Sequence, residues 1–119
     1  MATMKDYYVQ LMVHTDLGTD VDSTDAFKAS SVANMRARLI KQWGDKLINP
    51  RKNTHRDIRI YQSAPVNGYG IKGEFGYIGY WKGGAVPKEG AFVWTVYDKK
   101  TLMPTHHILN RDGTLGRRL

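Results

Sequence analysis

Apolar and polar residues alternate along the first part of the chain. In the segment Lys5–Thr15, the odd-numbered residues fall on one face of an extended strand and the even-numbered residues fall on the other. The even-numbered face is only half polar, so we expect this strand to be covered on both sides and to lie centrally in a sheet. The two sets are Tyr7, Val9, Leu11 and Val13, and Tyr8, Gln10, Met12 and His14.

Further along, the apolar residues recur at spacings of three and four. This period predicts an amphipathic helix over about residues 23–48, with Ser31–Trp43 as its best-defined part. Asp22 or Ser23 is expected to cap its N-terminus, and Pro50 follows its end. The apolar stripe consists of Val32, Met35, Leu39, Trp43 and Leu47.

Runs of β-forming residues after the helix predict further strands. They cover residues 56–62, 69–84, 91–97 and 105–109. Glycine interrupts the second run repeatedly, and we expect bulges or a bent hairpin there. The predicted order is β-α-β-β(-β)-β-β, without a second helix.

This order predicts the α+β class, with one helix packed on one face of a mainly antiparallel sheet. Nothing in the sequence resembles a linker or a repeat, so residues 1–119 are expected to form one domain. Residues 114–119 are expected to be a short, basic and mobile tail. The sheet face opposite the helix then meets solvent, a ligand or a partner.

Composition excludes several classes of protein. The chain has no cysteine, which excludes a disulfide framework and a zinc site built on thiolates. No apolar block follows a cationic N-terminus, and no run reaches the ~18 apolar residues of a membrane span. We expect a cytoplasmic protein with no membrane partner. Phosphate loops, nucleophile elbows and dinucleotide-binding fingerprints do not occur, so no cofactor is predicted.

The net charge of +7 is unevenly distributed along the chain. Residues 1–25 hold one lysine and five aspartates, a net charge of −4. Residues 26–119 hold seventeen basic and six acidic residues, a net charge of +11. Such a field attracts polyanions, whether RNA, DNA or an acidic protein. We expect a polyanion to meet the later part of the chain.

A cluster of cationic residues lies between the helix and the next strand. Five basic or potentially basic side chains occur within nine residues, across a loop and the start of a strand. They are Arg51, Lys52, His55, Arg56 and Arg59. Side chains of this kind bind phosphates without sequence preference. The alternative is a solvated loop that serves solubility.

Aromatic residues and glycine alternate through residues 68–84, which hold seven of the twelve glycines. Exposed aromatic side chains stack on nucleic-acid bases, and lysines nearby would bind phosphates. The candidates for this role are Tyr61, Lys72, Tyr77, Tyr80 and Trp81. The alternative is that these aromatic residues belong to the core.

One part of this stretch is partly similar to the central strand motif of the RNA-recognition-motif family. The residues that match it in type and spacing are Phe75, Gly76, Tyr77, Ile78 and Tyr80. Gly73 and Glu74 stand where that motif has a basic residue and a glycine. A loop over residues 83–90 stands where that family has its second helix. The chain is therefore not assigned to the family.

Two other clusters are weaker candidates for chemistry. Asp16, Asp20, Asp22 and Asp25 carry the oxygen ligands that Mg²⁺ or Ca²⁺ prefers. Their spacing does not match a calcium-binding loop. Helix capping and turn formation explain the same residues, so no metal site is predicted.

His106 and His107 are adjacent, so on a strand they point to opposite faces and cannot form one acid–base pair. Either of them, with Arg111, Tyr97 or Arg59, would suit a small ribonuclease. No spacing marks catalysis, and catalytic residues remain unassigned.

The sequence thus favours a small, non-enzymatic protein that binds RNA or DNA through the cationic cluster, assisted by aromatic stacking. A protein-interaction or regulatory module, as a homo-oligomer or with another partner, is the first alternative. A ribonuclease is the second. The sequence leaves the oligomeric state undetermined.

Overall fold

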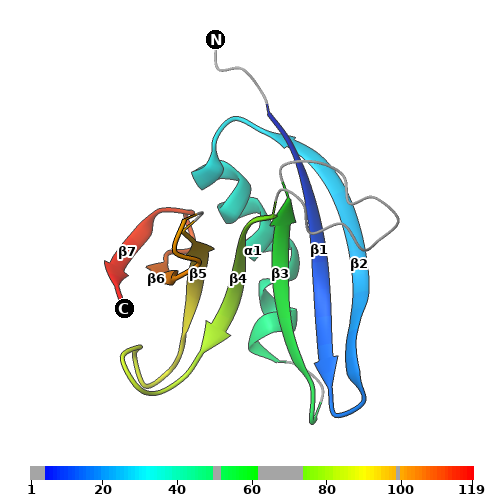
Figure 1. The fold of residues 1–119 in the computed structure, drawn as a ribbon, viewed down its shortest axis with the longest axis vertical. Helices are drawn as coiled ribbons and strands as arrows, with labels where there is room; N and C mark the ends of the chain where they lie inside the picture. The colour runs from blue at the N-terminus through cyan, green and yellow to red at the C-terminus, as the bar shows by residue number, and fades with distance from the viewer. Residues whose placement is uncertain (1–4, 50–51, 62–73, 99) are drawn as a thin grey trace.

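A computed structural model describes residues 5–49, 52–61, 74–98 and 100–119. Within these residues the chain forms one helix and seven strands (Figure 1). In chain order they are β1 (Lys5–Thr15), β2 (Gly18–Ala29), α1 (Val32–Ile48), β3 (His55–Tyr61), β4 (Glu74–Trp81), β5 (Ala91–Tyr97), β6 (Pro104–Leu109) and β7 (Leu115–Arg118). The predicted α+β architecture with one helix is confirmed.

The seven strands form one antiparallel sheet in the order β2-β1-β3-β4-β5-β6-β7. From β3 onward, each strand pairs with the next along the chain. The connection from β2 to β3 passes β1 and contains α1, so β2 and β3 run parallel with β1 between them. β1 is paired on both sides, as expected of an interior strand, but it lies next to the edge strand β2 rather than at the centre of the sheet.

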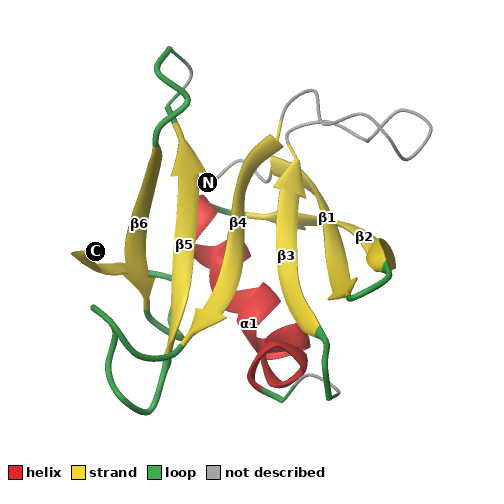
Figure 2. Cartoon of the chain, turned by 60° about the horizontal axis from the view of Figure 1, so that its bottom comes forward, coloured by secondary structure: helices red, strands yellow, loops and turns green. Residues whose placement is uncertain are grey.

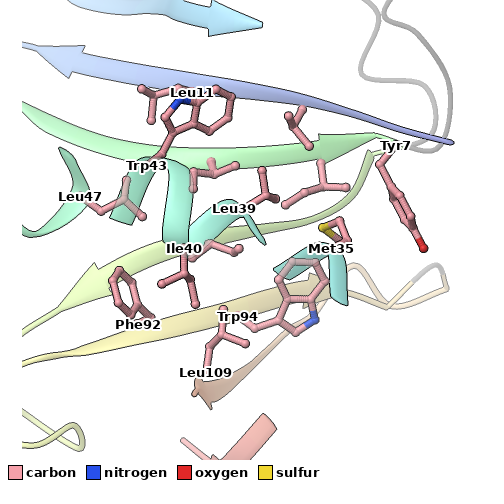
Figure 3. Packing of buried hydrophobic residues seen from close by; sticks show 14 of the residues in the cluster. Tyr7, Leu11, Met35, Leu39, Ile40, Trp43, Leu47, Phe92, Trp94 and Leu109 are labelled. Atoms are coloured by element: carbon pink, nitrogen blue, oxygen red, sulfur yellow. The ribbon is translucent and has the colours of Figure 1, made fainter. Parts of the chain in front are cut away.

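The helix packs on one face of this sheet, which we call the helix face. Figure 2 shows α1 behind the strands. Helix residues such as Leu39 lie between side chains of β1 and side chains of β5 (Figure 3). Of the predicted stripe, Val32 is partly buried. The other four members are buried: Met35, Leu39, Trp43 and Leu47. The predicted apolar stripe of the helix is therefore confirmed. The opposite face of the sheet is called the outer face.

Glycine at position 76 allows a close approach within the helix face. A Cβ atom there would lie 2.7 Å from a ring carbon of Trp94 and 2.9 Å from the carbonyl oxygen of Thr95. Real Cβ atoms essentially never come this close to other heavy atoms. The Trp94 indole, which belongs to the core, therefore occupies the space that a side chain at position 76 would need.

The helix begins later than the sequence pattern predicts. Residues 18–29 form strand β2, and α1 starts at Val32 rather than near residue 23. The N-cap is Ser31, whose hydroxyl accepts a hydrogen bond from the Asn34 amide at 3.0 Å. In the described residues, no helix is long and apolar enough to cross a membrane.

The aspartates expected to cap the helix lie in and beside β2 instead. Asp22 forms an ion pair with Arg56 of β3, with 3.3 Å between Oδ2 and Nε. Asp25 accepts a hydrogen bond from Gln42 of the helix at 3.2 Å. The prediction of capping at Asp22 was wrong because pairing with β1 along its whole length holds this segment extended.

The C-terminal segment also differs from its prediction. Residues 114–119 were expected as a tail, yet Leu115–Arg118 form β7, which pairs with β6. The turn before it is fixed to the helix, because Arg36 Nε donates a hydrogen bond of 2.8 Å to the Gly113 carbonyl. Arg36 is buried, with its guanidinium over the Trp94 ring, and burial lowers its pKa. Pairing and this buried contact order the segment.

The other predicted strands agree with the structure where residues are described. The run 91–97 is β5, the run 105–109 is β6 with one residue more, and the run 56–62 is β3 shifted by one residue. Residues 74–81 of the glycine-rich run form β4. Its residues 69–73 lie outside the described part of the chain, as does Gln62.

Candidate functional site

A row of polar side chains crosses the outer face of the sheet. The register places one residue from each of five neighbouring strands side by side. In order from β1 to β6 they are Gln10, Arg59, Tyr77, Thr95 and His106. Gln10 and Thr95 are buried, and the other three are half-buried. Because side chains alternate between the faces of a strand, each residue two positions along belongs to the same face.

A small pocket opens beside this row. It has a volume of about 200 Å³ and is lined by Asp57, Arg59, Tyr77 and Tyr97. The phenolic oxygens of Tyr77 and Tyr97 lie 3.3 Å apart, and their ring centroids are separated by 6.1 Å. Tyr97 retains 49% of its surface exposed to solvent. The pocket combines a carboxylate, a guanidinium and two phenols, and we call it the outer-face pocket.

Asp57 is held by a histidine on one side only. Its Oδ2 atom lies 2.9 Å from Nε2 of His14, and the other ring nitrogen of His14 lies 2.8 Å from the Thr19 hydroxyl. His55 lies next to His14, with 5.7 Å between the ring centroids. The second carboxylate oxygen, Oδ1, is buried and has no hydrogen-bond partner among the described residues. A buried acceptor without a donor costs free energy, and a ligand with an N–H group would satisfy it.

Tyr77 remains protonated far above neutral pH. Burial raises its pKa to about 12, and the hydrogen bond with Tyr97, the charge of Tyr97 and the negative charge of Asp57 act in the same direction. A hydrogen bond with Thr95 acts against them. The phenol therefore keeps its O–H donor at neutral pH, beside the Asp57 carboxylate.

Trp81 lies across the outer face of β4 because Gly79 leaves room for it. A Cβ atom at Gly79 would lie 3.3 Å from Nε1 of the indole. The indole reaches His106 of β6, with 4.8 Å between the ring centroids. Trp81 is half-buried, so part of the ring remains accessible to a planar ligand.

The residues that the sequence proposed for nucleic-acid binding do not all lie on the same face of the sheet. His55, Arg59, Tyr77 and Trp81 share the outer face. Tyr61 also belongs to this face but is buried, and its hydroxyl donates to Gln10 at 2.9 Å. It is therefore not available for base stacking.

The remaining nominated residues lie elsewhere. Arg56 is on the helix face and paired with Asp22. Tyr80 packs edge-to-face on Phe92 and donates to the Glu89 carbonyl, so it belongs to the core side of the sheet. Lys52 is exposed in the turn before β3. Arg51 and Lys72 lie outside the described residues.

Four residues of the site were not proposed for nucleic-acid binding: His14, Asp57, Tyr97 and His106. Tyr97 and His106 were considered only for the ribonuclease alternative. Alternation alone places Asp57 on the same face as Arg59, and Tyr97 on the same face as Thr95. What the sequence does not contain is the register that brings Tyr97 next to Tyr77 and brings Asp57 next to His14. His106 and His107 lie on opposite faces, as predicted, and His106 shares the outer face with Arg59 and Tyr97.

The described residues contain no group of three or more acidic or histidine side chains able to hold a metal ion. A second hollow, of about 380 Å³, lies beside α1 and is lined by four helix residues and by Arg111 of the turn between β6 and β7. Its cationic residues are Arg38, Lys41 and Arg111. The protein therefore has a second basic surface, on the other side of the sheet from the outer face. Substitutions there serve as controls for substitutions on the outer face.

No protein-family model, curated protein or solved structure matches this chain. The functional assignment therefore rests on the geometry of the site itself.

Proposed function

We propose that this protein binds single-stranded nucleic acid on the outer face of its sheet, without catalysis. The observation that carries the proposal is the combination, on one face, of accessible aromatic rings with cationic side chains. The rings belong to Tyr77, Trp81 and Tyr97. Arg59, between β1 and β4, supplies a permanent positive charge beside them.

Each kind of side chain suits a different part of a single strand. Bases stack on aromatic rings with a gain of about 1–3 kcal/mol each, largely independent of sequence. Arginine binds the phosphates, and histidines add charge when protonated. Tyr97 is half-exposed, and the Trp81 indole contacts Gly79 on one side and His106 on another. Rings held in place in this way lose little conformational freedom on binding.

A single strand fits this face better than a duplex. In a duplex the bases are stacked on one another and their faces are unavailable to protein rings. The aromatic side chains of the outer face would then contribute little, and only the cationic residues would bind. The basic hollow beside α1, with Arg38, Lys41 and Arg111, is the alternative surface for a duplex.

The test is fluorescence anisotropy with labelled 12-nucleotide single strands and the matching duplex. Trp81→Ala and Tyr97→Ala are expected to weaken single-strand binding by about 5- to 150-fold each. Arg59→Gln should weaken binding and reduce the slope of log K against log salt by about 0.7.

Lys41→Gln is the matched control for Arg59→Gln, since it removes one positive charge from the helix side. It should leave single-strand binding within about twofold of wild type, because its long-range effect is screened. An equal loss in both variants would contradict the outer face as the site. Absence of binding to any strand at low salt would reject the function.

A protein-interaction module is a second candidate, and one observation favours it. Leu102 and Met103, in the turn between β5 and β6, are 72% and 66% exposed. Apolar side chains together at a loop tip often mark a contact with another protein. Sedimentation of wild type and of Leu102→Ser/Met103→Ser tests the homo-oligomer: a mass above the monomer, lost in the variant, supports it.

A further inference from the structure

We infer that the outer-face pocket binds a guanine base of the single strand. The inference rests on the proposed function and adds to it the identity of one base. Asp57, whose Oδ1 atom is buried and has no hydrogen-bond partner among the described residues, lines this pocket together with Arg59 and the two tyrosines. Guanine carries N–H donors and a pair of neighbouring acceptors on its edges, which is the complementary arrangement.

The carboxylate supplies the acceptor. Oδ2 of Asp57 is held by His14, whereas Oδ1 is buried without a partner among the described residues. The N1–H and exocyclic amino groups of guanine are adjacent donors that a carboxylate oxygen accepts. His14, itself bonded to Thr19, fixes the orientation of the carboxylate from behind. The bound base would satisfy an acceptor that is otherwise buried at a cost.

The guanidinium supplies the donors. Arg59 follows Asp57 by two residues on the same face of β3, which places their backbones about 6–7 Å apart. Arginine pairs with the O6 and N7 acceptors of guanine through two of its N–H groups. At a guanine, Arg59 would therefore contact the base in place of the phosphate that it binds in strands without guanine. Adenine has an amino group where guanine has O6, and pyrimidines lack N7. Only guanine offers this acceptor pair together with the donors that Asp57 needs.

The pocket dimensions and its aromatic wall agree with a base rather than a larger ligand. Its volume of about 200 Å³ is below that of pockets for drug-sized molecules. Tyr97 provides a ring on which the base can stack. The Tyr77 phenol, neutral beside Asp57, adds a donor and an acceptor at the wall.

The experiment compares 10-nucleotide thymine strands that carry one central variable base. Guanine should bind at least about fivefold more tightly than adenine, cytosine or thymine at that position. Hypoxanthine, which lacks the exocyclic amino group, and 7-deazaguanine, which lacks N7, should each lose most of this preference. These ligand changes need no protein variant, so they test the contacts even if a substitution disturbs folding.

Asp57→Asn should abolish the preference for guanine, measured as the ratio of the affinities for the central-guanine strand and the all-thymine strand. Asp45→Asn, the same change on the exposed side of α1, is the matched control and should keep the preference. Equal affinity for all central bases, with the thymine strand still bound, would overturn the guanine inference and leave the proposed function standing. Loss of binding to every strand would reject both.

Discussion

At the scale of single residues, the most unusual environment is that of Tyr77. Its hydroxyl is close to the hydroxyl of Tyr97 and near the carboxylate of Asp57. Burial disfavours the ionised phenol most, the hydrogen bond with Tyr97 adds to this effect, and the negative charge of Asp57 contributes least. That is why its pKa is raised to about 12.

Tyr77 should therefore titrate later than an ordinary tyrosine. The folded pKa lies above the unfolded value of about 10, so the unfolded state releases its proton first as the pH rises. The contribution of this group to stability is complete below pH 10 and is lost between about pH 10 and pH 12. The difference in alkaline absorbance titration between wild type and Tyr77→Phe should have its midpoint near 12.

Tyr97→Phe is the control for this titration. It removes the hydroxyl that bonds Tyr77, so the midpoint assigned to Tyr77 should move down toward 10. A Tyr77 midpoint near 10 in the wild-type protein would contradict the burial of this phenol, and an unchanged midpoint in Tyr97→Phe would contradict the contact between the two phenols.

Part of this site can be predicted residue by residue. Alternation along β3 places Asp57 with Arg59, and alternation along β5 places Tyr97 with Thr95. The contact between Tyr77 and Tyr97 requires the register of β4 with β5, which no local pattern encodes. The same is true of the contact between Trp81 and His106, in which the indole packs closely against Gly79.

At the scale of elements, β2 shows where a local pattern misleads. Its first eight residues include three aspartates and a serine, which are residue types that cap helices. These residues have low strand propensity, so local preference indicates a turn and a helix start. A register shift opposite Leu11 and Met12 also breaks the alternation that would have indicated a strand. Pairing with β1 over eleven residues outweighs the local preference.

The position of the helix start can be tested with three serines. Ser31→Ala removes the hydroxyl that accepts the Asn34 amide, and should lower the free energy of unfolding by about 1 kcal/mol. Ser30→Ala and Ser23→Ala should change it by less than about 0.5 kcal/mol, since neither caps the helix. Urea denaturation followed by circular dichroism measures all three. A larger effect of Ser23→Ala than of Ser31→Ala would contradict the observed start.

At the scale of the whole molecule, charge changes across the sheet, from acidic at the edge strand β2 to basic toward β7. The acidic first part of the chain folds into the edge strand β2 and its hairpin with β1. The basic remainder supplies the helix and the strands from β3 to β7. Aspartates along β2 also discourage another chain from pairing with this exposed edge. A polyanion on the outer face should therefore approach from the side of β3 to β7.

Neutralising the acidic edge should strengthen binding of a single strand. Asp16 and Asp20 are exposed and lie at the hairpin end where His14 and His55 meet. Changing both to asparagine should raise affinity about twofold at ~0.02 M salt, because the screening length there exceeds 10 Å. The gain should vanish near 0.3 M salt as screening shortens the reach of these charges. Asp45→Asn/Glu89→Gln changes the net charge equally but away from this hairpin, and should give a smaller gain. Equal gains in the two double variants would show that net charge alone, and not the gradient across the sheet, governs the encounter.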